Sequence, residues 1–179
     1  SGMFTDVKVN WWELAGKTIG VIGLGNIGLR VAKVAEAFGM NVCYYSTSGT
    51  SHNKDYPSLP LEKLLAVSDI ASIHAPLNEK TKGLIGSREL SIMKPSAYIV
   101  NMGRGGIVEE QALAAAVDNG VIAGAALDVF EVEPLPKDSC FLKVRHPERF
   151  RLAPHVAWAS VEARERLVGM IADNIAKGW

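Results

Sequence analysis

The run Gly23-Leu24-Gly25-Asn26-Ile27-Gly28 constrains the fold of this chain more than any other feature. It follows a short apolar segment, residues 18–22, and precedes residues 27–38, where apolar residues recur at helical spacing. Glycines in this pattern allow a tight turn, a close approach of backbone to a pyrophosphate, and close packing of helix on strand. The phosphates then meet the free N–H groups at the helix start. The context predicts a dinucleotide-binding turn.

Strand-length apolar segments alternate with helical segments along the rest of the chain. We expect strands at 18–22, 41–45, 69–74, 97–101, 123–128 and 151–153, and helices at 27–38, 60–66, 87–93, 109–119 and 161–177. The first helix should bury a face made of Ile27, Val31, Val34, Ala35 and Phe38. This alternation predicts an α/β Rossmann fold: a doubly wound parallel sheet covered on both faces, in a single domain over 1–179.

The composition limits the classes of partner that this chain can be expected to bind. Lys plus Arg and Asp plus Glu both number 19, so no long-range field favours nucleic acid or an anionic membrane. No apolar stretch reaches the roughly 18 residues of a membrane span. The two cysteines have no CxxC spacing, which suits a reducing compartment, and we expect Cys43 in the core. The sequence therefore predicts a cytoplasmic protein, and no His, Cys or carboxylate cluster has the spacing of a metal site.

The residue that accepts the adenosine ribose hydroxyls should stand near position 46, where an Asp or Glu is usual. This chain has Ser46 there, followed by Thr47 and Ser48. Without a carboxylate, a 2′-phosphate meets no repulsion, and Lys54 or His52 could attract one. Ser46 could equally bond the ribose of NAD, so NAD and NADP both stay open.

Three ionisable residues follow predicted strands, at the edge where doubly wound sheets place their sites. They are Arg104, Glu133 and His155. An Arg can hold a carboxylate with two hydrogen bonds, and a His can give or take a proton near neutral pH. A carboxylate beside that His can orient the ring and favour its charged form. Together the three could reduce the carbonyl of a 2-oxo acid, although each alone is most often structural.

Several motifs in register make the chain similar to the D-isomer-specific 2-hydroxyacid dehydrogenases. The resemblance rests on five segments. In chain order they are Leu14-Ala15-Gly16-Lys17-Thr18, His74-Ala75-Pro76-Leu77, Asn101-x-x-Arg104-Gly105, Asp128-Val129-Phe130-Glu131-x-Glu133-Pro134 and Pro154-His155. It covers nearly the whole chain. It implies that Arg104, Glu133 and His155 are the catalytic residues of an NAD(P)-dependent oxidoreductase.

The resemblance also implies the role of each residue. Arg104 would bind the substrate carboxylate, His155 would be the general acid of reduction and the base of oxidation, and Glu133 would orient His155. Asp128 would contact the nicotinamide end, which Met102 and Gly103 would line through their backbone. The residues implied to contact the cofactor are Gly23, Gly25, Asn26, Ile27, Gly28, Ser46, Thr47, His74, Ala75, Pro76, Thr81, Met102, Gly103, Arg104, Asp128, His155, Ala157 and Trp158.

Ala157-Trp158 stands where many relatives carry two glycines. That version resembles the glycerate dehydrogenase and hydroxypyruvate reductase branch, and the indole would narrow the substrate pocket. Alternatively, Trp158 packs against a neighbouring subunit.

The family has a second domain that closes over the substrate, and we expect this substrate domain to be absent from the chain. The chain alone should bind cofactor and be nearly inactive. The resemblance also implies a homodimer through the cofactor domain, for which the loop 130–150, Trp11 and Trp12 would suit an interface.

Two alternatives share this fold. A dinucleotide-sensing corepressor would keep the same three residues, but zero net charge and no appended disordered tail favour the enzyme. A formate dehydrogenase relative would pair a Gln with the His where Glu133 stands.

Overall fold

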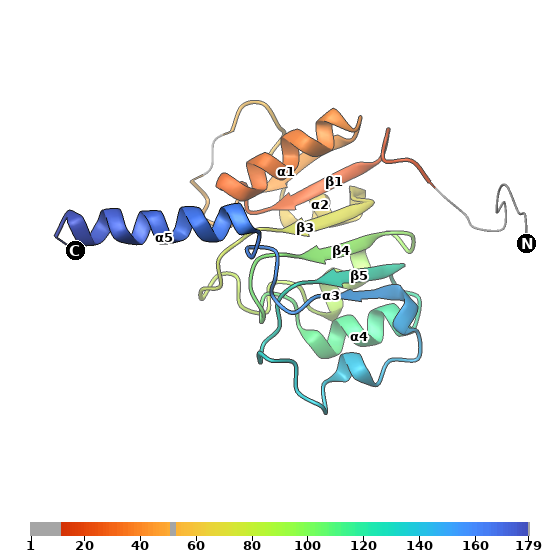
Figure 1. The fold of residues 1–179 in the computed structure, drawn as a ribbon. Coiled ribbons are helices and arrows are strands. Elements are labelled where there is room, and N and C mark those ends of the chain that lie inside the picture. The colour runs from red at the N-terminus through yellow and green to blue at the C-terminus, as the bar shows by residue number, and fades with distance from the viewer. Residues whose placement is uncertain (1–11, 51–52, 179) are drawn as a thin grey trace, which may run out of the picture.

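The strands build one parallel sheet. The computed structural model describes residues 12–50 and 53–178, and within them the strand order is β2-β1-β3-β4-β5-β6 (Figure 1). In chain order the strands are β1 (Thr18–Ile22), β2 (Asn41–Tyr45), β3 (Ile70–Ile73), β4 (Tyr98–Asn101), β5 (Gly124–Leu127) and β6 (Phe150–Leu152). Because all of them run parallel, their carboxyl ends meet at one edge.

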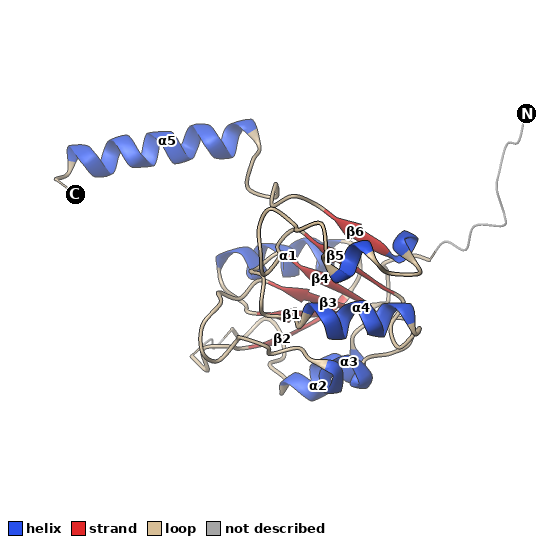
Figure 2. Cartoon of the chain, turned by 90° about the horizontal axis from the view of Figure 1, so that it is seen from below, coloured by secondary structure: helices blue, strands red, loops and turns tan. Residues whose placement is uncertain are grey.

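Helices lie on both sides of the sheet. On one side α1 (Asn26–Ala37) packs on β1 and β2, and on the other lie α2 (Leu61–Val67), α3 (Ser87–Ile92) and α4 (Glu110–Asp118) (Figure 2). Each expected helix and strand is present, with ends within one residue of the prediction. The predicted α/β class and doubly wound parallel sheet are confirmed. The order reverses at β1, and such a switch point is where these sheets bind ligands.

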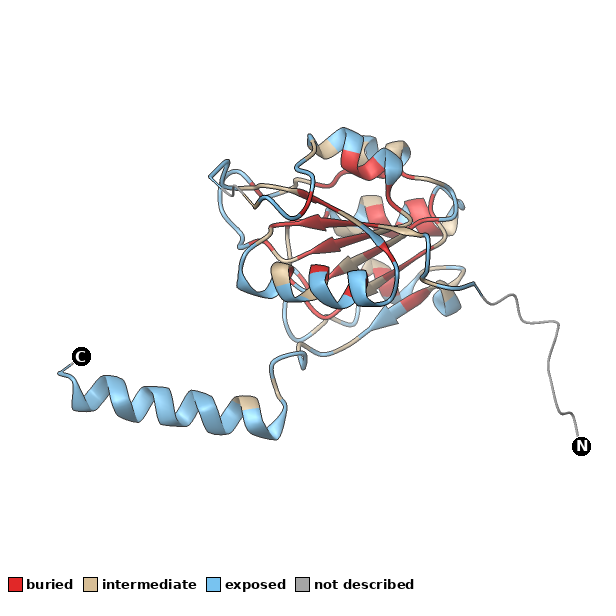
Figure 3. Ribbon diagram, turned by 90° about the horizontal axis from the view of Figure 1, so that it is seen from above, coloured by how far each residue is buried: buried red, intermediate tan, exposed pale blue. Residues whose placement is uncertain are grey.

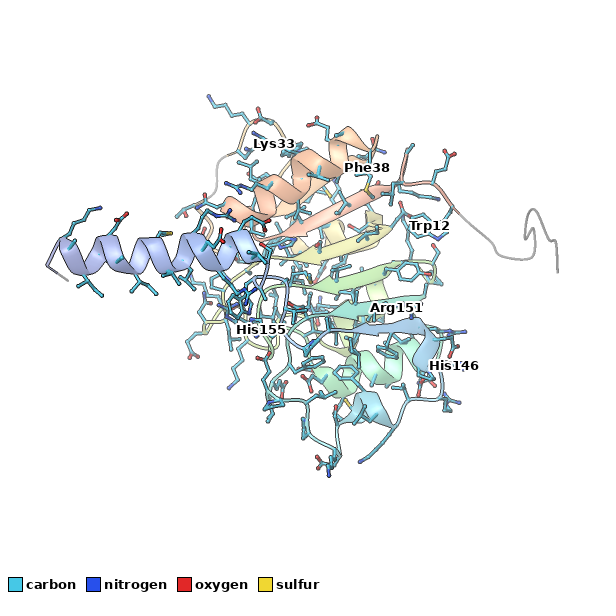
Figure 4. The ribbon with its side chains drawn as sticks, in the orientation of Figure 1. Trp12, Lys33, Phe38, His146, Arg151 and His155 are labelled. Atoms are coloured by element: carbon cyan, nitrogen blue, oxygen red, sulfur yellow. The ribbon has the colours of Figure 1, made fainter. Side chains whose placement is uncertain are left out.

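The buried face of α1 matches the prediction only in part: Ala35 is buried and Val31 packs against the core, but the other three predicted side chains are exposed. Ile27, Val34 and Phe38 are 66%, 56% and 60% exposed, whereas the helix buries Gly28, Ala32 and Ala35 (Figures 3 and 4). Small side chains face the sheet because helix and strand lie very close together: a Cβ on Gly28 would come within 2.2 Å of the Gly23 carbonyl oxygen. Helical spacing alone did not show which of two apolar stripes faces inward.

The sheet is not covered evenly. The larger core lies between the sheet and α2, α3 and α4, and includes Ile73, Ile99 and Leu113. On the α1 side, the described residues place no helix over β4, β5 and β6, where an open hollow of about 380 Å³ is lined by Tyr98, Val100 and Ala126 among others. The expectation of a sheet covered on both faces therefore holds only for its β1 half.

The long segment after β5 packs on its own domain. Phe141, in the short 3-10 helix η1 (Cys140–Leu142), is buried with its ring centroid 6.0 Å from that of Phe130 and 5.7 Å from that of Phe150. A second 3-10 helix, η2 (Pro147–Arg149), leads into β6. Burial of Phe141 explains why the segment can be long and irregular, since it has its own anchor.

Helix α5 (Val161–Ala176) projects away from the domain, and none of its residues is buried (Figures 1 and 3). It nevertheless has a side-chain N-cap, because the Ser160 hydroxyl accepts a hydrogen bond from the Ala163 N–H. Among the described residues, no helix has the length and apolar character needed to cross a membrane.

Candidate active site

The glycine turn leaves open space at the start of α1. Gly23 follows β1 with φ of +92°, which favours glycine, and a Cβ on it would come within 2.9 Å of the Ala75 backbone nitrogen. A Cβ on Gly25 would meet nothing within 4 Å. The turn therefore combines crowding at its ends with free space at its middle glycine, as a bound pyrophosphate requires.

A hollow of about 220 Å³ lies beside this turn. Its lining includes predicted cofactor residues from three separate segments, namely Gly23, Gly25, Ser46, Thr47, His74 and Pro76. Ser46 also borders a second hollow of about 620 Å³. Lys54 is the charged residue in that second lining, while His52 lies outside the described residues. The described lining of both hollows contains no carboxylate, which suits a ligand carrying phosphates.

His74 presents a neutral ring to the first hollow. Burial lowers the pKa of His74, because the charged ring would lose its hydration. Its Nε2 lies 2.8 Å from the Ser72 hydroxyl, whereas its Nδ1 is buried without a hydrogen-bond partner. A buried polar atom without a partner is uncommon, and a ligand group would satisfy it.

Thr81 and Ala75 lie beneath the surface. Thr81 is fully buried, and its hydroxyl donates to the Pro76 carbonyl at 2.6 Å and accepts from the Asn78 N–H at 2.8 Å. This hydroxyl therefore holds the loop after His74 in shape. Ala75 is also buried and packs against the glycine turn.

Asn101, which the sequence did not single out for a role, shapes the turn that carries Arg104. It ends β4, its side-chain oxygen accepts from the Gly103 N–H at 3.0 Å, and its side-chain nitrogen donates to the Arg104 carbonyl at 3.0 Å. The Arg104 guanidinium is exposed and donates to the Gly103 carbonyl at 2.8 Å. Met102 is exposed and Gly103 is buried.

Glu133 and His155 form a pair at the same edge, and Figure 4 shows His155 there. His155 Nδ1 lies 2.7 Å from Glu133 Oε2, and Glu133 Oε1 accepts from the Phe130 N–H at 2.9 Å. The hydrogen bond from His155, that from Phe130, and the positive charge of Arg104 lower the pKa of Glu133. With Nδ1 engaged by the carboxylate, Nε2 is the ring nitrogen left for a substrate.

Asp128 supports the segment that carries His155. It follows β5, its side chain is 3% exposed, and its Oδ1 and Oδ2 accept from the N–H groups of Val156 and Ala157, both at 2.9 Å. His155 itself has φ of +53°. The neighbouring Trp158 is 53% exposed.

A pocket of about 530 Å³ lies against the Glu133–His155 pair. Its other walls are mainly apolar: Phe130, Pro134, Leu135, Leu152, Ala153 and Pro154. The carboxyl edge thus brings together an imidazole held by a carboxylate, a nearby guanidinium, and open space at the start of α1. In the described part of the chain, no three His, Cys, Asp or Glu side chains gather as metal ligands would.

One family model matches residues 2–157, and its description is D-isomer specific 2-hydroxyacid dehydrogenase, NAD binding domain. A glyoxylate reductase of Korarchaeum cryptofilum is 44% identical over 181 residues, which cover 94% of this chain and 53% of that protein. A glycerate dehydrogenase of Methylorubrum extorquens is 41% identical, over 92% of this chain and 50% of that protein.

Two solved structures show the same fold. D-lactate dehydrogenase of Aquifex aeolicus, complexed with NAD and lactic acid, has a TM-score of 0.85 and 30% identity, over 97% of this chain and 57% of its own. A 2-hydroxyacid dehydrogenase of Rhizobium etli, described as probable and in complex with NADP, has a TM-score of 0.77 and 30% identity, over 95% and 55%. The chain spans about half the length of the relatives it matches.

Proposed function

The chain belongs to the D-isomer specific 2-hydroxyacid dehydrogenase family as its NAD-binding domain, and we propose that it binds a nicotinamide dinucleotide for the reduction of a small 2-oxo acid. The observation that carries this proposal is the Glu133–His155 pair, at 2.7 Å, beside Arg104 and at the same edge as the glycine turn. The relatives named glyoxylate reductase and glycerate dehydrogenase favour glyoxylate or hydroxypyruvate as the substrate.

The two hollows support a cofactor site along the glycine turn and Ser46. The N–H groups at the start of α1 would bind the pyrophosphate, Ser46 and Thr47 would bind the adenosine ribose, and His74 Nδ1 would gain a partner from the bound ligand. The choice between NAD and NADP stays open, and the solved relatives include complexes with each.

The atoms that remain available for a substrate support one role for each catalytic candidate. When bound, the reduced nicotinamide supplies the hydride. Arg104 would hold the substrate carboxylate with two hydrogen bonds. His155 would donate its Nε2 proton to the carbonyl oxygen, while Glu133 keeps the ring oriented through Nδ1.

We further propose that the rest of the full-length protein closes over this edge, because the relatives are about twice as long. The chain alone should bind NADH yet reduce glyoxylate at least about 10²-fold more slowly than the full-length protein, because nothing holds the substrate from the other side. Steady-state kinetics on both proteins would measure this. Equal turnover would contradict it.

A panel of glyoxylate, hydroxypyruvate, pyruvate and phenylpyruvate, each with NADH and NADPH, tests the function of the full-length protein. Reduction of at least one acid supports the proposal. Cofactor binding with no turnover on any acid would instead favour a dinucleotide sensor. Homodimer formation through this domain and a cytoplasmic location stay predictions.

Two glycines of the turn give a matched test of cofactor binding. Gly25→Thr should leave stability nearly unchanged, because Thr suits a helix N-cap about as well as Gly, and a side chain there meets open space. It should weaken NADH binding by about tenfold or more by filling the space where the backbone would approach the pyrophosphate. Fluorescence titration would measure the affinity.

Gly28→Ala should mainly lower the stability of the fold. Its Cβ would lie 2.2 Å from a backbone oxygen, and we expect a loss of about 1–3 kcal/mol in the free energy of unfolding. Chemical denaturation would measure it. A Gly25→Thr protein that binds NADH as well as the wild type would exclude the turn from the cofactor site.

A further inference from the structure

We propose that Asp128 is a positioning residue for His155: its carboxylate holds the backbone N–H groups of Val156 and Ala157, and so fixes the turn that aims the imidazole at Glu133. This inference rests on the proposed function for its kinetic consequence, and on the geometry of the described residues for its structural part.

The backbone at His155 needs support. Its φ of +53° lies in the left-handed region, and among the described residues it is the one non-glycine residue with a positive φ. A side chain in this conformation is strained, and it persists only where surrounding contacts hold it. The strain occurs at the proposed proton donor.

Asp128 supplies those contacts. The N–H groups of Val156 and Ala157 point the same way, and one carboxylate takes both, each at 2.9 Å. Successive N–H groups after such a turn form a concave site for an anion, and here a side chain of the protein occupies it. Because Asp128 is buried, these charge-assisted hydrogen bonds form away from competing water.

Asp128 is itself well anchored. Its N–H donates to the Asn101 carbonyl at 3.1 Å, so the end of β5 is held by the end of β4. The same Asn101 shapes the turn that carries Arg104. Asp128 therefore ties the position of His155 to the strands on which the other candidate catalytic residues depend.

The variant that tests this is Asp128→Asn, which keeps the size and one acceptor but turns an NH₂ group toward one of the two N–H donors. Amide hydrogen exchange at Val156 and Ala157, followed by NMR in the cofactor-free chain, should accelerate about tenfold or more. Asp138→Asn is the matched control, because it removes the same charge from an exposed position in the segment after β5, and it should leave both amides unchanged.

A measurement on the wild-type chain covers the case in which Asp128→Asn does not fold. Scalar couplings across the hydrogen bonds, from the amide nitrogens of Val156 and Ala157 to Cγ of Asp128, should be detectable. Absence of both couplings would overturn the proposal, as would unchanged exchange in a folded Asp128→Asn chain.

Kinetics of the full-length protein give the functional half of the test. Asp128→Asn should lower kcat by about 10²-fold and raise the KM for NADH by much less, since its main effect is a misaligned proton donor. A rise in that KM with kcat unchanged would show that Asp128 serves the nicotinamide and would overturn a positioning role. If wild-type protein reduces no 2-oxo acid, the proposed function fails, and the NMR results still decide the role of Asp128.

Discussion

Replacing His155 with Gln should lower kcat for 2-oxo acid reduction by about 10²- to 10⁴-fold, the usual contribution of a general acid. Gln can still accept or donate a hydrogen bond, but it cannot deliver a proton at neutral pH. The affinity for NADH should change by less than about threefold, since the glycine turn and the hollow beside it lie on other segments. Stopped-flow measurement of NADH oxidation by the full-length protein would give the rate of the chemical step.

His146→Gln provides a matched control. His146 also pairs with a carboxylate, with its Nδ1 3.2 Å from Glu148 Oε1, but Figure 4 shows it at the opposite edge of the sheet from His155. We expect wild-type kcat for this variant. If His155→Gln retained more than about a tenth of the wild-type kcat, the proton would have to come from another group.

The glycine turn and the sheet could be predicted from the sequence because local patterns encode them. Short apolar segments bounded by Gly and Pro mark strands, and each strand end appears within one residue of its predicted place. The same patterns say nothing of where a helix packs. The sequence predicts a helix over 161–177, yet only the structure shows that α5 projects from the domain with none of its residues buried (Figure 1).

The candidate catalytic residues could be found because each follows a strand, and strand ends converge in a parallel sheet. The contacts that hold them in place could not be found in this way, even though Asp128 itself was predicted at the nicotinamide end. Asn101 and Asp128 act on backbone groups, Asn101 two and three residues away and Asp128 across to the segment after β6. No sequence pattern marks a side chain whose partner is a distant N–H group, because every residue except proline has one.

Replacing Glu133 with Gln should move the pH dependence of reduction. The wild-type carboxylate, whose pKa is lowered mainly by its hydrogen bond to His155, stays ionised through the neutral range and attracts the imidazole N–H at Nδ1. A neutral amide removes that attraction. The decline of the reduction rate at acid pH, which protonation of Glu133 causes in the wild type, should therefore be missing from the variant, because an amide does not titrate there.

The same substitution has a signature in stability. Because the folded state lowers the pKa of Glu133 below its usual value of 4.5, the pair stabilises the fold above that pH, and the contribution is lost as the pH falls through the lowered value. The difference in Tm between wild type and Glu133→Gln should accordingly be present near pH 6 and shrink toward zero at the acid end. Calorimetry across this range would measure it.

Glu131→Gln separates the effect of the pair from that of net charge. Glu131 is exposed, lies two residues before Glu133, and carries the same charge, so its loss changes the general field in the same way. Its pH–rate profile should overlie that of the wild type. A Glu133→Gln profile that also overlies the wild type would mean that the 2.7 Å contact does not control the proton on His155. In that case the carboxylate would serve only to hold the segment at the Phe130 N–H.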